Sequence, residues 1–240
     1  MLHTAIHCYI LLYTAKYFYI LIHTVIDCYI LIYTATYCNI LLHAVIYCYI
    51  QLRTATYSYK KLHSVLLYDI LLHTGLYCYI MKHTAIYCYI QIYSLFSCNI
   101  LLYTALYRYI MLYAATKCYI LLHTDIYCYI LLHTATQSYI LLHTATYCFI
   151  QLYNALYCYI LLHTDIYCYI QIYSVIYCYI IQCTATYWYT LLHTAIYNYI
   201  LLYNVIHCYL LFYTATYSNI LLHTDIYKYM LLYILLYKGT

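Results

Sequence analysis

The chain has 240 residues, enough to bury a sizeable core, but only 6% of them are charged and the formal net charge is +4. Soluble domains carry roughly 25% charged residues and use Gly and Pro in their turns, whereas here Pro is absent and Gly occurs twice. This composition argues against an ordinary soluble enzyme domain, and nine scattered Lys and Arg residues form no basic stripe for nucleic acid.

The whole chain is built from one ten-residue unit, and residues 139–148 (YILLHTATYC) are a clear copy of it. Twenty-four copies follow one another from Met1 to Thr240 without insertion or deletion. We number the places of the unit by the last digit of the residue number, so that Cys128 and Cys148 both occupy place 8, and Ile130 occupies place 10. A fixed period dictates the architecture and makes most short motifs accidental.

The unit equals the translation of a ten-nucleotide DNA word read three times. The word TGTTATATAC, written three times, encodes Cys-Tyr-Ile-Leu-Leu-Tyr-Thr-Val-Ile-Tyr. The recurrent alternatives are His or Tyr at place 3, Ala or Val at place 5, and Ile or Thr at place 6, and each pair differs by one base. Because the other two forward frames encode the same peptide in another phase, none contains a stop codon. We therefore predict that a tandem decanucleotide repeat encodes the chain.

Departures from the unit follow the genetic code more closely than they follow side-chain chemistry. Where Cys is missing from place 8, several substitutes share little chemistry but each lies one base from a Cys codon: Phe18, Ser58, Tyr68, Arg108 and Trp188. Place 5 admits Val25, Gly75, Asp125, Asp165 and Asp225 beside Ala, and place 2 admits Lys82 and Gln182. Selection for packing would instead exchange residues of similar volume, because an unpaired buried charge costs several kcal/mol, roughly. The pattern predicts drift without selection for folding.

In chain order, residues 1–50 stay close to the unit, and residues 1–10 are its first copy, without the features of a secretory signal. Residues 51–70 are the most altered, because Arg53, Lys60, Lys61 and Asp69 crowd together there. We take this segment as the best candidate for a hinge or exposed bend. The unit recovers in residues 71–230 and is lost in the final copy, residues 231–240. We expect a single tandem-repeat region over residues 1–240, with no separate domains.

The composition of the unit favours β-strands. Ile, Tyr, Thr, Val and Cys dominate, and β-branched and aromatic side chains fit a pleated strand better than a helix. Ten is an even number, so alternation would keep the even places on one face and the odd places on the other. In a helix each copy would instead be rotated by about 80° from the last. With so little Gly and Pro, we expect bends at places 4 and 5, where Thr, Ser, Asn and Asp collect.

These patterns predict an all-β repeat protein, a β-solenoid-like stack of short strands from the 24 ten-residue copies. Two copies per coil would give a rung of twenty residues. The alternative is a set of hydrophobic, membrane-like α-helices, because charge-free runs such as residues 166–224 far exceed the roughly 20 residues that span a bilayer. Against helices, each copy carries Thr and Tyr, which are unfavourable at the centre of a membrane.

Recurring His and Cys residues raise the question of a metal or catalytic site. His at place 3 and Cys at place 8 recur along the chain, as in His123, Cys128, His133, His143 and Cys148. In a stack of coils, Cys residues of successive coils would lie about 4.8 Å apart, close enough to share a metal ion. A uniform spacing of five residues is not a chelate motif, however, and the DNA repeat produces it without selection. His–Asp pairs could orient an imidazole, but no nucleophile stands out beside them: His123 with Asp125, His163 with Asp165, and His223 with Asp225. We predict no catalytic, cofactor-binding or metal-binding residue.

For function, we expect a chain without enzymatic activity, cofactor, small-molecule substrate or nucleic-acid partner, produced by translation of the DNA repeat. Tyrosine columns could stack on bases, but they lack the basic residues that nucleic-acid binding needs. Two alternatives stay open, an integral membrane protein and a Tyr- and Cys-rich structural protein that assembles with itself. The high β-propensity, low charge and absence of Pro favour self-association. The sequence assigns no compartment.

Overall fold

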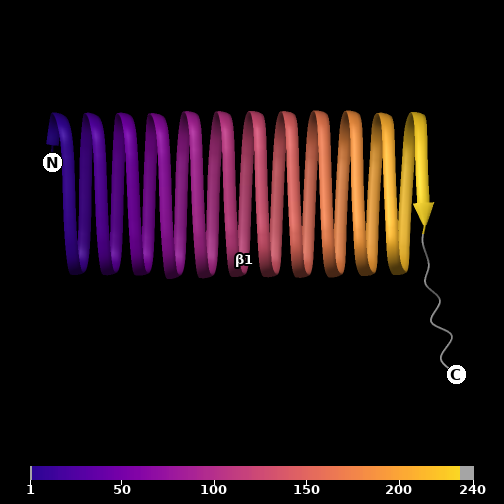
Figure 1. Cartoon of the computed structure of the whole chain (residues 1–240), viewed down its shortest axis with the longest axis horizontal. Helices are drawn as coiled ribbons and strands as arrows, with labels where there is room; N and C mark the ends of the chain where they lie inside the picture. Colours follow the sequence, from indigo (N-terminus) through magenta and orange to yellow (C-terminus); the bar gives the residue numbers. More distant parts are fainter. Residues whose placement is uncertain (1, 233–240) are drawn as a thin grey trace, which may run out of the picture.

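The computed structural model describes the backbone of residues 2–232, with the side chains of 2, 3, 224–226, 228 and 230–232 left outside that description. One continuous strand, β1, runs from Leu2 to Leu232 and winds into a stack of flat coils along one axis (Figure 1). The predicted all-β repeat is therefore confirmed. The part of the chain described here contains no helix, and so none that is long and apolar enough to cross a membrane.

Each coil contains twenty residues, which is two copies of the unit. Aromatic rings twenty residues apart lie stacked, as in Tyr107 and Tyr127 with ring centroids 4.9 Å apart and Tyr127 and Tyr147 at 4.8 Å. This separation equals the usual distance between hydrogen-bonded strands, about 4.8 Å. Successive coils run in the same direction, so each residue lies beside its own counterpart in the next coil. We call such a series, twenty residues apart, a column.

The core is formed by places 2, 5, 8 and 10. In the copy at residues 141–150, Leu142, Ala145, Cys148 and Ile150 are buried, whereas Tyr147 is exposed. The prediction that all even places share one face was therefore wrong at places 4 and 6, which point outward, and the odd place 5 lies on the inner face with places 2, 8 and 10. A strand whose side chains alternate strictly between two faces stays flat. To close into a coil, the strand must in places put two successive side chains outward between inward ones. This happens twice in each copy, at places 3 and 4 and at places 6 and 7.

The coil closes without tight turns. Among residues 2–232 no peptide bond is cis and no residue has positive φ, so the curvature is distributed over extended backbone. This explains how the chain bends without Pro and almost without Gly. The bends expected at places 4 and 5 do not appear as turns, because the described residues are strand throughout; place 4 points outward and place 5 inward. Residues 51–70, the best candidate for a hinge or exposed bend, continue the strand without interruption. Residues 233–240, where the unit is lost, lie outside the described part.

Gly75 shows how closely the place 5 columns are packed. A Cβ atom added to Gly75 would lie 2.6 Å from Cδ2 of Leu95 and 3.0 Å from the carbonyl oxygen of Ala55. Leu95 is itself larger than the usual Ala of place 5, and it fills the space that the missing Cβ of Gly75 leaves. The two departures from the unit therefore compensate each other in volume.

This packing predicts a double-mutant cycle. Gly75→Ala should lower the free energy of unfolding by roughly 1–3 kcal/mol, because the extra methyl overpacks the column. In a Leu95→Ala background the same change should cost much less, since the leucine side chain that it would strike is gone. Chemical denaturation of the four proteins measures both effects. Equal costs of Gly75→Ala in the two backgrounds would contradict the close contact.

Candidate functional site

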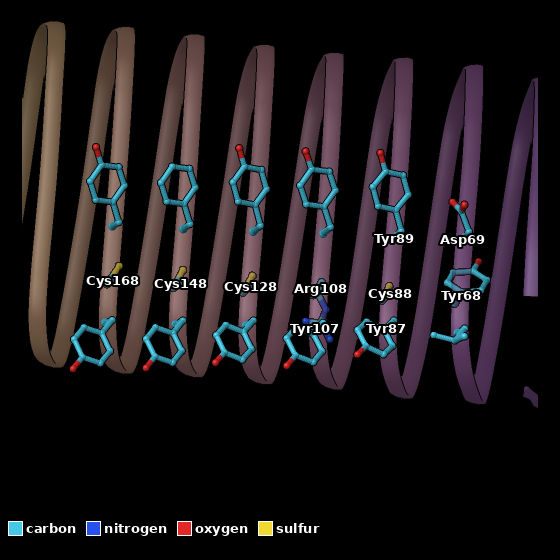
Figure 2. Close-up of a pocket in the computed structure, with 18 of the residues that line it drawn as sticks. Tyr68, Asp69, Tyr87, Cys88, Tyr89, Tyr107, Arg108, Cys128, Cys148 and Cys168 are labelled. Atoms are coloured by element: carbon cyan, nitrogen blue, oxygen red, sulfur yellow. The ribbon is translucent and has the colours of Figure 1, made fainter. Parts of the chain in front are cut away.

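Two grooves run along the stack where Tyr residues at places 7 and 9 flank the buried place 8. The long groove encloses about 930 Å³ and is lined by places 7, 8 and 9 of alternate copies between Tyr29 and Tyr209. Figure 2 shows its two walls, with Tyr87 and Tyr107 on one side, Tyr89 on the other, and the place 8 side chains between them. The short groove encloses about 340 Å³ and is lined by the other copies, between Ser138 and Asn219.

The walls of the long groove are regular columns of stacked rings. From Tyr87 to Tyr187 along one wall, neighbouring centroids are 4.8–5.0 Å apart and the ring planes lie within 6° of each other. From Tyr89 to Tyr189 along the other wall the separations are 4.7–5.0 Å, with Phe149 replacing one Tyr. The short groove is shorter because Ser97, Lys117 and Gln137 interrupt its place 7 column.

Buried thiols lie beneath the tyrosines. None of the fifteen cysteines, all of which lie among the described residues, forms a disulfide. Cys128, Cys148 and Cys168 occupy neighbouring coils on the floor of the long groove. A hydrogen bond to Cys148, together with burial, raises the pKa of Cys128 well above its ordinary value. Burial raises the pKa of Cys38 to about 11. Because the thiolate is the nucleophile and the metal ligand, protonated thiols of this kind are chemically inert at neutral pH.

One ion pair lies inside the core. Nη1 of Arg108 donates to Oδ2 of Asp125 at 2.7 Å, and both side chains are almost fully buried. Burial raises the pKa of Asp125 to about 7, although the guanidinium of Arg108 opposes this shift. Similarly, Nζ of Lys82 lies 4.3 Å from the centre of the Tyr68 ring, and burial lowers the pKa of Lys82 to about 8. In each pair, two departures from the unit meet in space.

Other polar side chains are buried without such a partner. Neither carboxylate oxygen of Asp165 makes a hydrogen bond, and burial raises its pKa to about 7. The Gln182 amide and the Ala145 backbone lie near this carboxyl and oppose the shift, but neither completes a hydrogen bond to it. The Nζ atom of Lys60 is also without a partner, and burial lowers the pKa of this lysine. Both amide atoms of Asn198 are unpaired as well.

The structure separates the His and Cys residues that recur in the sequence. His123, His133 and His143 are exposed on the outside of the coils, whereas Cys128 and Cys148 are buried inside. His123 and His143 stack on each other at 4.8 Å. Within the described residues, no three His, Cys, Asp or Glu side chains come together in a way that could hold a metal ion.

The His–Asp pairs are separated in the same way. Asp125 points into the core toward Arg108, while His123 faces outward; Asp165 and His163 likewise lie on opposite sides of the backbone. The side chain of Asp225 lies outside the described part, so its pairing with His223 is not addressed by the structure. At these two described pairs, therefore, the carboxylate does not contact the imidazole of the neighbouring histidine.

Comparisons with protein-family models, with curated proteins and with solved structures gave no match to this chain. The grooves were missed in the sequence, although the signal is present there: a buried Cys at place 8 lies between Tyr residues at places 7 and 9. Reading places 7 and 9 as two walls requires knowing that place 8 points inward.

The equivalent residues Asp125 and Asp165 predict opposite effects of the same substitution. Each is 2% exposed, but only Asp125 has a cationic partner. Asp165→Asn should raise the free energy of unfolding at pH 8 by up to about 4 kcal/mol, because it removes a carboxylate whose charge is unfavourable in the core. Asp125→Asn should lower it by roughly 3–5 kcal/mol, because Arg108 then stays buried without its counter-charge.

The pH dependence has a definite sign. The folded-state pKa of Asp165, about 7, lies above the ordinary value of 3.8, so stability falls as pH rises through this interval. The gain from Asp165→Asn should therefore be complete above pH 7 and vanish near pH 4. Denaturation at a series of pH values measures it. Two variants that shift stability in the same direction would contradict the assigned difference between the two sites.

Proposed function

We propose that this chain is the translation of a tandem decanucleotide repeat and that it has no enzymatic activity, cofactor or substrate. The observation that supports this proposal is the set of polar side chains buried in the core without partners. Lys60, Asp165 and Asn198 occupy places that hold Ile, Ala or Cys in other copies. An unpaired polar group in a protein interior costs roughly 1–3 kcal/mol, and a charge costs more.

Selection for a stable fold removes such residues first, because two or three of them together can cancel most of the free energy of unfolding of a domain. The inferred DNA word supplies them directly. An Ile codon ATA becomes Lys by one base change, as needed at Lys60, and an Ala codon GCT becomes Asp by one base change, as needed at Asp165. Mutation alone therefore accounts for residues that packing disfavours.

Some departures from the unit lie beside a second departure that compensates for them, and such pairs are the observation that would argue against the proposal. Arg108 with Asp125, Lys82 with Tyr68, and Leu95 with Gly75 each bring two departures together. In-register stacking brings each residue beside its counterparts in neighbouring coils, so some departures from the unit meet by chance. The coding DNA distinguishes chance from selection more directly than the protein does.

A second candidate function is that of a self-assembling structural protein. Within the described residues, the first and last coils each have a neighbouring coil on one side only (Figure 1). Open edges of flat, uncharged β-structure pair with other chains. The repeat of the coils matches the spacing of strands in cross-β assemblies, about 4.8 Å. A second copy could therefore continue the stack without a change in register.

The first proposal predicts the pattern of changes in the coding DNA. Aligned copies of the thirty-nucleotide unit should show replacement changes as often per site as silent changes, because no amino acid has been protected. Sequencing the locus and comparing its copies measures the ratio. A clear excess of silent changes, especially in the codons of places 2, 8 and 10, would contradict the proposal.

The second candidate predicts end-to-end assembly that a charge at the open edge prevents. The purified protein should form filaments whose length increases with concentration, as seen by electron microscopy and sedimentation. Leu12→Lys places a charge on the core face of the first coil, where Leu12 is partly buried, and should shorten or abolish the filaments. Thr14→Lys adds the same charge at an exposed position in the same coil. Equal behaviour of the two variants would argue against stacking through the ends.

A further inference from the structure

The long groove combines the features of a site for a rod-shaped aromatic molecule. Its two walls are unbroken columns of aromatic rings between the coils of Tyr87 and Tyr187. Five steps of about 4.8 Å give these walls a length of roughly 24 Å. A flat molecule lying along the axis would contact Tyr side chains of several coils on both sides at once.

The regularity of the walls favours a planar ligand over a flexible apolar one. Neighbouring rings are almost parallel, for example within 1° for Tyr107 and Tyr127 and within 3° for Tyr109 and Tyr129. The walls therefore repeat the same contact at each coil, and a conjugated ligand meets it along its whole length without bending. Rigid aromatic partners also lose little conformational freedom on binding.

A single carboxylate interrupts one wall of this groove. Asp69 takes the place of Tyr in the wall column between Tyr49 and Tyr89, and it is half-buried in the groove lining beside Tyr68 (Figure 2). Among the described residues, Asp69 forms no ion pair. Two cations within two coils of Asp69 along the chain are engaged elsewhere, because Arg108 binds Asp125 at 2.7 Å and Lys82 lies over the Tyr68 ring.

The aromatic wall begins one coil beyond Asp69, at Tyr89, so the negative charge and the stacked rings are adjacent along the axis. The short groove offers a comparison within the same molecule. It has the same Tyr–Cys–Tyr arrangement, but its lining contains Ser138, Asn198 and Asn219 and no acidic side chain.

We propose that the long groove binds an elongated, planar aromatic cation, which lies along the stack between the two tyrosine walls with its positive charge beside Asp69. The ligand class follows from the shape and charge of the groove and requires no selection for binding. This binding proposal goes beyond the absence of enzymatic activity proposed above. It holds whether the protein is a monomer or is assembled end to end.

The test uses thioflavin T, a flat benzothiazolium cation, and its uncharged benzothiazole analogue, each titrated by fluorescence into the full-length chain. Tyr127→Ser should weaken binding of both probes by about tenfold, because it interrupts one wall of the long groove. The matched control is Tyr177→Ser in the short groove. Both tyrosines are 41% exposed, and both stack on a ring on each side, at 4.8–4.9 Å.

Tyr177→Ser should leave the affinity unchanged, and Asp69→Asn should weaken the cationic probe by up to about fivefold without affecting the neutral one. Circular dichroism of each variant checks that the coils are intact. Three results would overturn the proposal: no binding of either probe, equal losses with Tyr127→Ser and Tyr177→Ser, or equal effects of Asp69→Asn on the two probes. The second of these would indicate binding to any exposed tyrosine column.

Discussion

The structure depends on the in-register pairing of parallel coils. A twenty-residue coil is twice the ten-residue unit, so hydrogen bonding between coils places each side chain next to its counterpart in another copy. Identical apolar and aromatic residues pack well in this arrangement, as the columns of Ile, Leu and Tyr show. The stability of the fold comes from this repetition, because each coil has the same interface with its neighbours.

The same repetition determines what a departure from the unit does. A charge in a column lies between apolar residues of the adjacent coils, and water is excluded from it, as at Lys60 and Asp165. Only another departure within reach can relieve it. Asp125 has a cationic partner in Arg108, whereas Asp165, forty residues further along the same column, has only the uncharged Gln182 amide nearby. The cost of a substitution in this chain is therefore set by the copies beside it more than by the residue type.

The two grooves originate in the outward-facing tyrosines of a uniform stack. They need no residue that differs from the unit. What gives the long groove a direction is Asp69, a departure that interrupts one wall. Binding surfaces can thus arise on a repetitive chain through its geometry, with charge added by a single altered copy.

The sequence by itself determined the strand conformation, the ten-residue period, the absence of a second kind of element in the described chain, and the stacking of like residues, because composition and an even period act locally. Only the tertiary structure decided which places point inward. Alternation by two describes a flat strand, and closing the coil moved Ala145 and Asp125 inside while Thr144 stayed outside. The Arg108–Asp125 pair joins residues seventeen positions apart. The twenty-residue rung alone could not predict this pair, because the pair also requires that place 5 points inward. The two grooves likewise require that place 8 points inward between the outward places 7 and 9.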